Sequence, residues 1–306
     1  MGFFRPVKAG VHLGAGRLAI AEVEKQGGGI RLRNHEIAYL TERVLSPDPL
    51  SPGVRDAELV QKTLRAMLKP GRRLKKVSVS LSDLVARVTL IPMEKPIRRP
   101  DDVEKLIRWK IEKDSLSRTQ ELRIRYQLFP PVLLASSIHE PVLLQYEEVL
   151  HAGGLEPCLI DIASFHVFNL YHDVLFKRSA PHHRFIFIYA GDSIFTVMIF
   201  SGGVPDFIRI KALRSQSRSV EDKVVEELRS SLSFYGEGHD LSAFTHVFLA
   251  GLPVSQILSK SLGDAFPWEV EQLKPEEVLS IASKSGEVRE EDWPILMPAI
   301  AAAVGR

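Results

Sequence analysis

The same order of short segments occurs twice in this 306-residue chain. In the first half, two apolar runs flank a tight turn that contains Gly14 and Gly16, and a third strand-like stretch follows at 30–33. In the second half, the same series of apolar runs and glycine turns extends over 185–210. Short alternating runs separated by glycine turns are typical of β-hairpins. The chain is therefore predicted to contain two copies of a three-strand meander.

A helix and a buried strand follow each meander. The first pair is predicted at 55–69 and 76–81, and the second pair at 220–235 and 245–250. Between the repeats, the segment 84–154 alternates as strand, helix, strand, strand, helix, which is typical of a small α+β domain. We therefore expect an α/β protein whose duplicated βββαβα core carries an insertion in its first half.

Composition and charge narrow the function classes. Forty lysines and arginines against 38 acidic residues give a net charge of +2, which does not indicate a nucleic-acid partner. The single cysteine, Cys158, excludes an internal disulfide, and we expect a buried, inert thiol in a reducing compartment. The histidines show no metal-ligand spacing. No run of about 18 apolar residues occurs, so we expect a cytoplasmic protein without a transmembrane segment.

Four segments share a pattern with one known family. They are a helix with Arg108-Trp109 over 103–112, the turn 151–157 followed by Asp161, the helix 226–235, and the alanine-rich end 298–305. In this order they resemble the PilM-like type IV pilus assembly proteins, which are relatives of FtsA in the actin-like ATPase superfamily. The GspL-type cytoplasmic domains of type II secretion are the alternative.

The resemblance implies an actin-like, ribonuclease H-like fold in three parts. The first actin-like half would be 1–83 plus 155–183, the inserted FtsA 1C-like domain 84–154, and the second half 184–306. Only about ten residues, 211–220, stand where the family places a further small helical subdomain. We therefore expect that subdomain to be reduced or missing.

The resemblance also implies a nucleotide between the two halves, held by the glycine turns. The matching turn residues are Gly14, Ala15, Gly16, Gly191, Asp192 and Gly251. Magnesium chemistry needs carboxylate oxygens, but the two acidic positions of the family are occupied here by His12 and Tyr189. We therefore expect a vestigial site, no cofactor and no ATP hydrolysis. ATP with Mg²⁺, gating assembly in an active ATPase, is the alternative.

The family resemblance further implies an adaptor that is peripheral to the inner membrane and binds the short cytoplasmic tail of a PilN-like bitopic protein. Trp109 lies off the apolar stripe of its helix, so it either packs on the neighbouring core or lines a groove for the partner. We expect Arg87, Arg108 and Trp109 to contact the tail, with the strand 122–129 as a backbone edge, and Trp109→Ala to weaken binding by at least about tenfold.

Two further points stay open from the sequence. A homo-oligomer is an additional partner class. The basic clusters at 72–76 and 98–99 are either solvated loops or contacts to anionic lipid headgroups.

Overall fold

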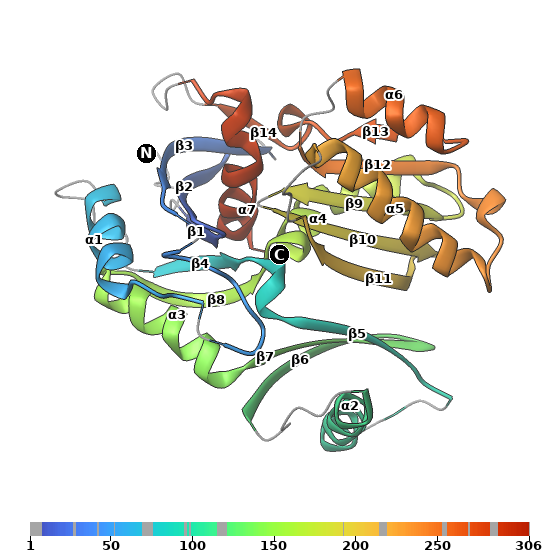
Figure 1. Cartoon of the computed structure of the whole chain (residues 1–306), viewed down its shortest axis with the longest axis horizontal. Coiled ribbons are helices and arrows are strands. Elements are labelled where there is room, and N and C mark those ends of the chain that lie inside the picture. Colours follow the sequence, from blue (N-terminus) through green and yellow to red (C-terminus); the bar gives the residue numbers. More distant parts are fainter. Residues whose placement is uncertain are drawn as a thin grey trace.

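Three β-sheets and their covering helices make up the computed structural model of this protein (Figure 1). The structure describes residues 8–26, 29–41, 43–51, 53–68, 76–94, 97, 99–114, 121–191, 193–213, 219–252, 256–268, 270–281 and 287–305. The basic residues at 72–75 and 98, and the turn residue Asp192, lie outside these ranges.

The first sheet has six strands in the order β14-β3-β2-β1-β4-β8. Its strands are β1 (Lys8–Gly14), β2 (Arg17–Gln26), β3 (Gly29–Tyr39), β4 (Lys76–Leu81), β8 (Glu156–Ile162) and β14 (Leu279–Ile281). The antiparallel meander β1-β2-β3 continues into the parallel pairs β1-β4 and β4-β8, so β8 is an edge strand. The meander predicted for the first half is present.

The second sheet has five strands in the order β11-β10-β9-β12-β13. It contains β9 (Phe185–Gly191), β10 (Ile194–Ser201), β11 (Val204–Ala212), β12 (His246–Gly251) and β13 (Val270–Gln272). Its first three strands form the second antiparallel meander, and β12 runs parallel to β9 as β4 runs parallel to β1. The two sheets therefore repeat one topology, and the duplication predicted from the sequence is confirmed.

Local sequence signals fix the helices beside these sheets. Helix α1 (Ala57–Met67) begins after Asp56, whose carboxylate accepts the N–H of Leu59 at 2.9 Å. Helix α5 (Val220–Gly236) begins in the same way after Ser219, and α6 (Gln256–Ala265) follows β12. In each half, the helix after the meander buries its apolar stripe against the sheet.

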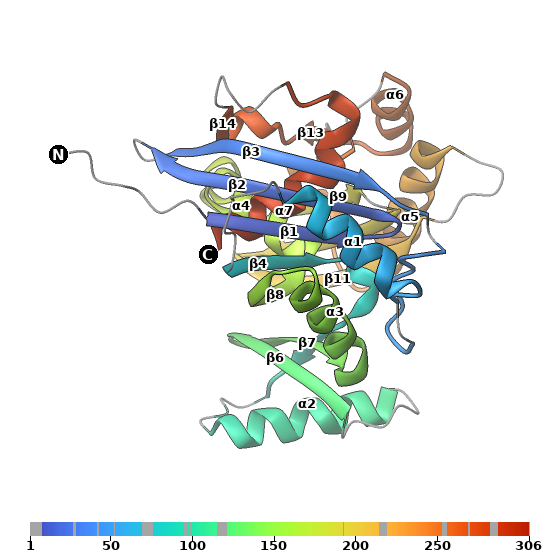
Figure 2. The same ribbon diagram turned by 90° about the vertical axis from the view of Figure 1, so that its left-hand side faces the viewer.

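The inserted unit is a three-stranded sheet covered on one face by a helix. Its strands are β5 (Arg87–Pro92), β7 (Val132–His139) and β6 (Leu122–Phe129), in that order across the sheet. Helix α2 (Pro100–Asp114) lies across the sheet at the end of the molecule (Figure 2). The small apolar core between them includes Val103, Ile107, Ile111, Leu122, Leu133 and Ala135.

Helix α3 (Glu140–Ala152) does not belong to the core of the inserted unit, in which we expected it. Its buried Val142, Tyr146 and Val149 pack into the apolar core of the first sheet, together with α1. The physical reason is that α3 has its buried face toward the larger sheet, while the small sheet is already covered by α2.

The end of the chain also returns to the first half. Strand β14 pairs with β3, and helix α7 (Trp293–Val304) packs against β1. At Gly10 the approach is so close that an added Cβ would lie 2.0 Å from the carbonyl oxygen of Ala299. Helix α7 and helix α4 (Ala163–Arg178) share one apolar core with strands of both large sheets, so they join the two halves.

Candidate functional site

The first glycine turn, between β1 and β2, is tied to its own half by backbone hydrogen bonds. Gly16 adopts a positive φ of 68°, its N–H donates to the carbonyl oxygen of Leu45 at 3.1 Å, and its carbonyl accepts the N–H of Leu40 at 2.7 Å. A phosphate-binding loop needs backbone N–H groups that point to the ligand. The Gly16 N–H is already committed within the protein.

The two residues at the acidic positions of the family are fully buried. The Nδ1 atom of His12 lies 3.1 Å from the hydroxyl and 3.2 Å from the carbonyl oxygen of Ser80. Tyr189 belongs to the apolar core that α7 and α4 share with both sheets. Neither side chain supplies the carboxylate oxygens that a hard dication prefers.

The glycine turn after β12 is closed by a direct backbone contact. The N–H of Leu252 donates to the carbonyl oxygen of Ala190 at 2.6 Å. Gly251 has a φ of 99°, and a Cβ added there would lie 2.0 Å from the same oxygen. A glycine at this position permits the close approach of β12 and β9. The packing of the two strands is therefore enough to explain why a glycine stands here. Gly191, at the end of β9, is likewise buried.

A carboxylate that the sequence analysis missed lies where the two halves meet. Asp83 is fully buried, accepts the hydroxyl of Thr196 at 2.6 Å, and accepts the N–H of Ser164 at 2.9 Å. Burial raises the pKa of this carboxyl group. Asp83 connects the root of the inserted unit, the first turn of α4 and strand β10, so it holds the two halves together.

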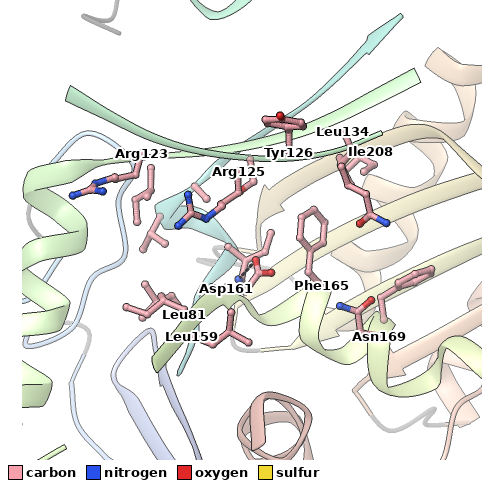
Figure 3. Close-up of a pocket in the computed structure, with 18 of the residues that line it drawn as sticks. Leu81, Arg123, Arg125, Tyr126, Leu134, Leu159, Asp161, Phe165, Asn169 and Ile208 are labelled. Carbon is pink, nitrogen blue, oxygen red and sulfur yellow. Dashed lines mark hydrogen bonds between the residues drawn. The ribbon is translucent and has the colours of Figure 1, made fainter. Parts of the chain in front are cut away.

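A wide cavity lies between the inserted unit and the rest of the molecule, and we call it the junction groove. It has a volume of about 630 Å³. Its walls are β8, the face of β6 and β7 away from α2, and side chains of α3, α4 and β11 (Figure 3). Pockets of this size are typical of ligand sites.

The junction groove is apolar on the side of α4 and carries charges elsewhere. Phe165 and Phe168 of α4 and Ile208 of β11 supply apolar surface. Arg125 points into the groove from β6, and Asp161 faces it from β8 (Figure 3). Among the described residues, neither of these two side chains lies within salt-bridge distance of an opposite charge. Arg123, in contrast, pairs with Glu140 at 2.6 Å.

Asp161 occupies an unusual environment for a carboxylate. One of its oxygens accepts the N–H of the next residue, Ile162, at 2.7 Å. Burial raises the pKa of the carboxyl group to about 6. Burial makes the ionised form of this carboxyl group less stable. Ionisable groups with a pKa shifted in this way are found more often in binding sites than in packed cores.

Cys158 corrects an expectation from the sequence. The thiol was expected to be buried, but Cys158 is exposed and lines the junction groove next to Leu159, which is 43% exposed. The reason is that β8 is an edge strand, which has a neighbouring strand on one side only. Apolar side chains on such a strand reach solvent although the sequence pattern is that of a buried strand.

The structure does not bring the three predicted partner-binding residues together in the junction groove. Trp109 is 56% exposed on α2, with the ammonium of Lys113 5.3 Å from its ring centre. Arg108 pairs with Glu104 at 2.7 Å on the same helix. Arg87 lines a separate cavity of about 450 Å³ between β5 and β11. Helix α2 covers the opposite face of the small sheet, so Trp109 and Arg108 point away from the groove.

The groove-lining residues of β6 had a sequence signal that could have been used. In the strand Leu122–Phe129, Arg123, Arg125 and Gln127 alternate with apolar positions. Alternation places them on one face of the sheet, while Leu122 and Ile124 lie on the α2 side. Nothing in the local sequence, however, indicates that this polar face is opposite β8.

The described residues contain neither a membrane-spanning helix nor a group of metal ligands. No helix there is both long and apolar enough to cross a membrane. No three histidine, cysteine or acidic side chains in the described ranges are grouped so that they could hold a metal ion.

Similarity to solved structures identifies the fold. No family model and no curated protein matches the chain. Among solved structures, a chain of the PilM-PilN type IV pilus biogenesis complex matches with a TM-score of 0.77 and 19% identity, covering 98% of each chain. The cytoplasmic domain of EpsL, an inner-membrane component of the Vibrio cholerae type II secretion system, matches with a TM-score of 0.55 and 7% identity, covering 98% of this chain and 96% of that one.

A third similar structure is described as having an actin-like ATPase fold. It is a Bacteroides thetaiotaomicron protein of unknown function with an actin-like ATPase fold, with a TM-score of 0.54 and 12% identity, covering 90% of this chain and 95% of that one. The likeness to PilM inferred from sequence motifs is therefore confirmed at the level of the fold. This chain has an actin-like α/β fold, and over its whole length it is similar to a chain of the PilM-PilN complex.

Proposed function

We propose that this protein is a non-enzymatic adaptor of a type IV pilus or related secretion platform, peripheral to the inner membrane. In this proposal it binds the short cytoplasmic tail of a PilN-like bitopic membrane protein. The observation that carries the proposal is the junction groove, a cavity of about 630 Å³ with an apolar wall and two charges, Arg125 and Asp161, that have no opposite charge within reach among the described residues. The similarity to a chain of the PilM-PilN complex supports the choice of partner.

Dimensions and chemistry of the groove favour a peptide over a folded partner. The strand β8 that forms one side is seven residues long. A short extended segment matches such a length, because a strand rises about 3.3 Å per residue. Apolar side chains of the segment would contact Phe165, Phe168 and Ile208, and its polar groups would reach Arg125 and Asp161. A short cytoplasmic tail has little other surface to offer.

The absence of enzymatic activity is part of the same proposal. His12 and Tyr189 stand at the acidic positions, and backbone N–H groups of two glycine turns are bonded to carbonyl oxygens of the protein itself. Phosphoryl transfer depends on groups that position the phosphates, the metal ion and the attacking water. These features support an actin-like scaffold that has no ATP chemistry. A nucleotide-binding ATPase is the competing function.

Calorimetric titration separates the two functions. The probes are a synthetic peptide with the cytoplasmic tail of the PilN-like protein from the same genome, and Mg-ATP. We expect the peptide to bind with a Kd in the micromolar range, about −8 kcal/mol, and Mg-ATP to give no heat of binding. Binding of Mg-ATP with phosphate release above background, together with no heat from the peptide, would overturn the proposal in favour of the ATPase.

A further inference from the structure

The residues that line the junction groove differ in their spacing from one strand to the next. On β7, every second residue lines it: Leu134, Ser136 and Ile138. These residues are the cross-strand partners of Gln127, Arg125 and Arg123 on β6, which also line the groove together with Phe129 and, between them, Tyr126. The period of two, complete on β7 and interrupted on β6 by Tyr126 alone, means that the groove lies against a face of the β6-β7 hairpin.

On β8 the spacing is different. Six consecutive residues, from Pro157 to Ile162, line the groove. Side chains from both faces of a strand border one cavity only when the cavity lies along the edge of that strand. Within the described ranges, β8 pairs with β4 on its other side, and no backbone hydrogen bond is found on the side of the groove. The open edge of the six-stranded sheet therefore forms the floor of the junction groove.

We propose that the bound segment is added to β8 as a further β-strand of the six-stranded sheet. This inference rests on the proposed function and specifies how the tail is held. Alternate backbone N–H and C=O groups of β8 would pair with the segment, as in other complexes formed by β-strand addition. It replaces the strand Leu122–Phe129, which we first expected to provide the backbone edge, because that hairpin presents its face to the groove.

The surroundings of the edge define the chemistry of the occupant. Side chains of an added strand alternate between the two faces of the sheet. On one face they would meet the aromatic wall formed by Phe165 and Phe168 of α4, and on the other Leu143, Leu144 and Glu147 of α3. The occupant is therefore an extended segment with an apolar residue at every second position, on the side of α4.

The polar groups on the hairpin have a place in the same arrangement. An added strand has a second edge, whose N–H and C=O groups would face β6 and β7. Arg125 and Gln127 are donors on that wall, and Ser136 is both donor and acceptor. These side chains would satisfy polar groups that otherwise remain unpaired in a mostly apolar cavity.

Two features of β8 limit which strands can be added. Pro157 has no N–H to donate to an added strand, and Asp161 puts a charge beside the edge. Proline and charged residues on edge strands are known to prevent uncontrolled pairing between copies of one chain. The edge is therefore open to a selected short segment and protected against sheet-to-sheet aggregation.

Backbone N-methylation of the tail peptide tests the inference, because it removes one N–H donor and keeps the side chain. A series of peptides, each methylated at one of eight consecutive nitrogens, is titrated into the full chain. We expect an alternating result, in which the positions facing β8 lose at least about tenfold in affinity and their neighbours lose less. Losses without alternation, or no losses, would overturn strand addition.

Hydrogen exchange of the β8 amides provides the second readout and separates two kinds of failure. Strand addition predicts slower exchange at alternate residues within 158–162 when the unmodified peptide is bound. If the peptide binds and shields the Cys158 thiol while these amides exchange as before, strand addition is wrong and the adaptor function stands. If the peptide neither binds nor shields Cys158, the proposed function and this inference are both wrong.

Discussion

The region where the two halves meet and the junction groove differ in how their backbone N–H groups and charged side chains are satisfied. Where the halves meet, the Gly16 and Leu252 N–H groups of the glycine turns and the Asp83 carboxylate are bonded within the protein. In the groove, Arg125 and Asp161 have no opposite charge within reach among the described residues, and the edge of β8 is unpaired. A protein keeps unpaired polar groups at a cost in stability, so the region that keeps them is the better candidate for binding.

The largest expected effect is at Gly251, in the glycine turn at the end of β12. Gly251→Ala forces a Cβ to within 2.0 Å of a backbone oxygen, at a φ of 99°. We expect the variant to lose about 3 kcal/mol or more of unfolding free energy, measured by urea denaturation. Gly202→Ala is the matched control, because φ is 62° and no atom lies within 4 Å of the added Cβ. Equal stability of the two variants would mean that Gly251 is not required by the fold.

Asp83 provides the next test of the contact between the two halves. Asp83→Ala leaves the Thr196 hydroxyl and the Ser164 N–H buried without an acceptor, which costs about 2 kcal/mol of stability. In a double-mutant cycle with Thr196→Val, we expect a coupling energy of about 1 kcal/mol, since the two side chains form one contact across the halves. Additive losses would contradict the direct link between the halves.

For the junction groove, the informative measurement is the affinity for the tail peptide and not the free energy of unfolding. Leu159→Arg places a long cation on the exposed part of β8, and we expect at least about tenfold weaker binding of the tail peptide, with a melting temperature close to that of the wild type. Trp109→Ala is the control, because Trp109 is exposed on the far side of the small sheet.

The same pair of variants decides between two accounts of partner binding. The exposed position of Trp109 on its helix predicts a large loss of affinity for Trp109→Ala if the tail binds at α2, whereas the position of the junction groove predicts almost none. A loss of affinity for Trp109→Ala with full binding by Leu159→Arg would move the binding surface to α2.

A smaller effect is expected from pH. The pKa of Asp161 in the folded protein is raised to about 6, above its ordinary value, so the folded state binds this proton more tightly than the unfolded state. The ionised carboxyl group therefore lowers stability above about pH 6, and this penalty disappears as the pH falls toward 4.

Asp161→Asn removes that titration. We expect the variant to be more stable than the wild type at pH 7 by about 1 kcal/mol, and the difference to shrink to near zero at pH 4. Urea denaturation at a series of pH values measures it. A difference that is constant with pH would show that Asp161 titrates normally.

Much of the fold was predictable because its signals are local. Glycine turns and alternating runs identify each meander, and Asp56 and Ser219 mark the starts of two helices. Which sheet a segment packs against is not a local property and is harder to predict. Helix α3, which we expected in the inserted unit, packs on the first sheet, and residues 279–281, which we expected within the second half, pair with β3, because an apolar stripe does not indicate which sheet covers it.

The candidate site was harder to predict for the same reason. The replacement of acidic residues by His12 and Tyr189 is visible in the sequence once the turns are aligned. Asp83, Arg125 and Asp161 lie far apart in the chain. The contact between the two halves places Asp83, and the packing of the inserted unit against β8 brings Arg125 and Asp161 to one groove. The sequence around Cys158 has the pattern of a buried strand, and only the strand order shows that β8 is at an edge.

That cysteine allows the most direct test of the central claim, because it is the single cysteine of the chain and lines the junction groove. The measurement is the rate at which a thiol reagent modifies Cys158, with and without a saturating concentration of the tail peptide. The account predicts rapid modification of the free protein and at least about tenfold slower modification with the peptide, since a segment paired with β8 covers the thiol. An unchanged rate with the peptide bound would show that the partner binds elsewhere and would contradict the account.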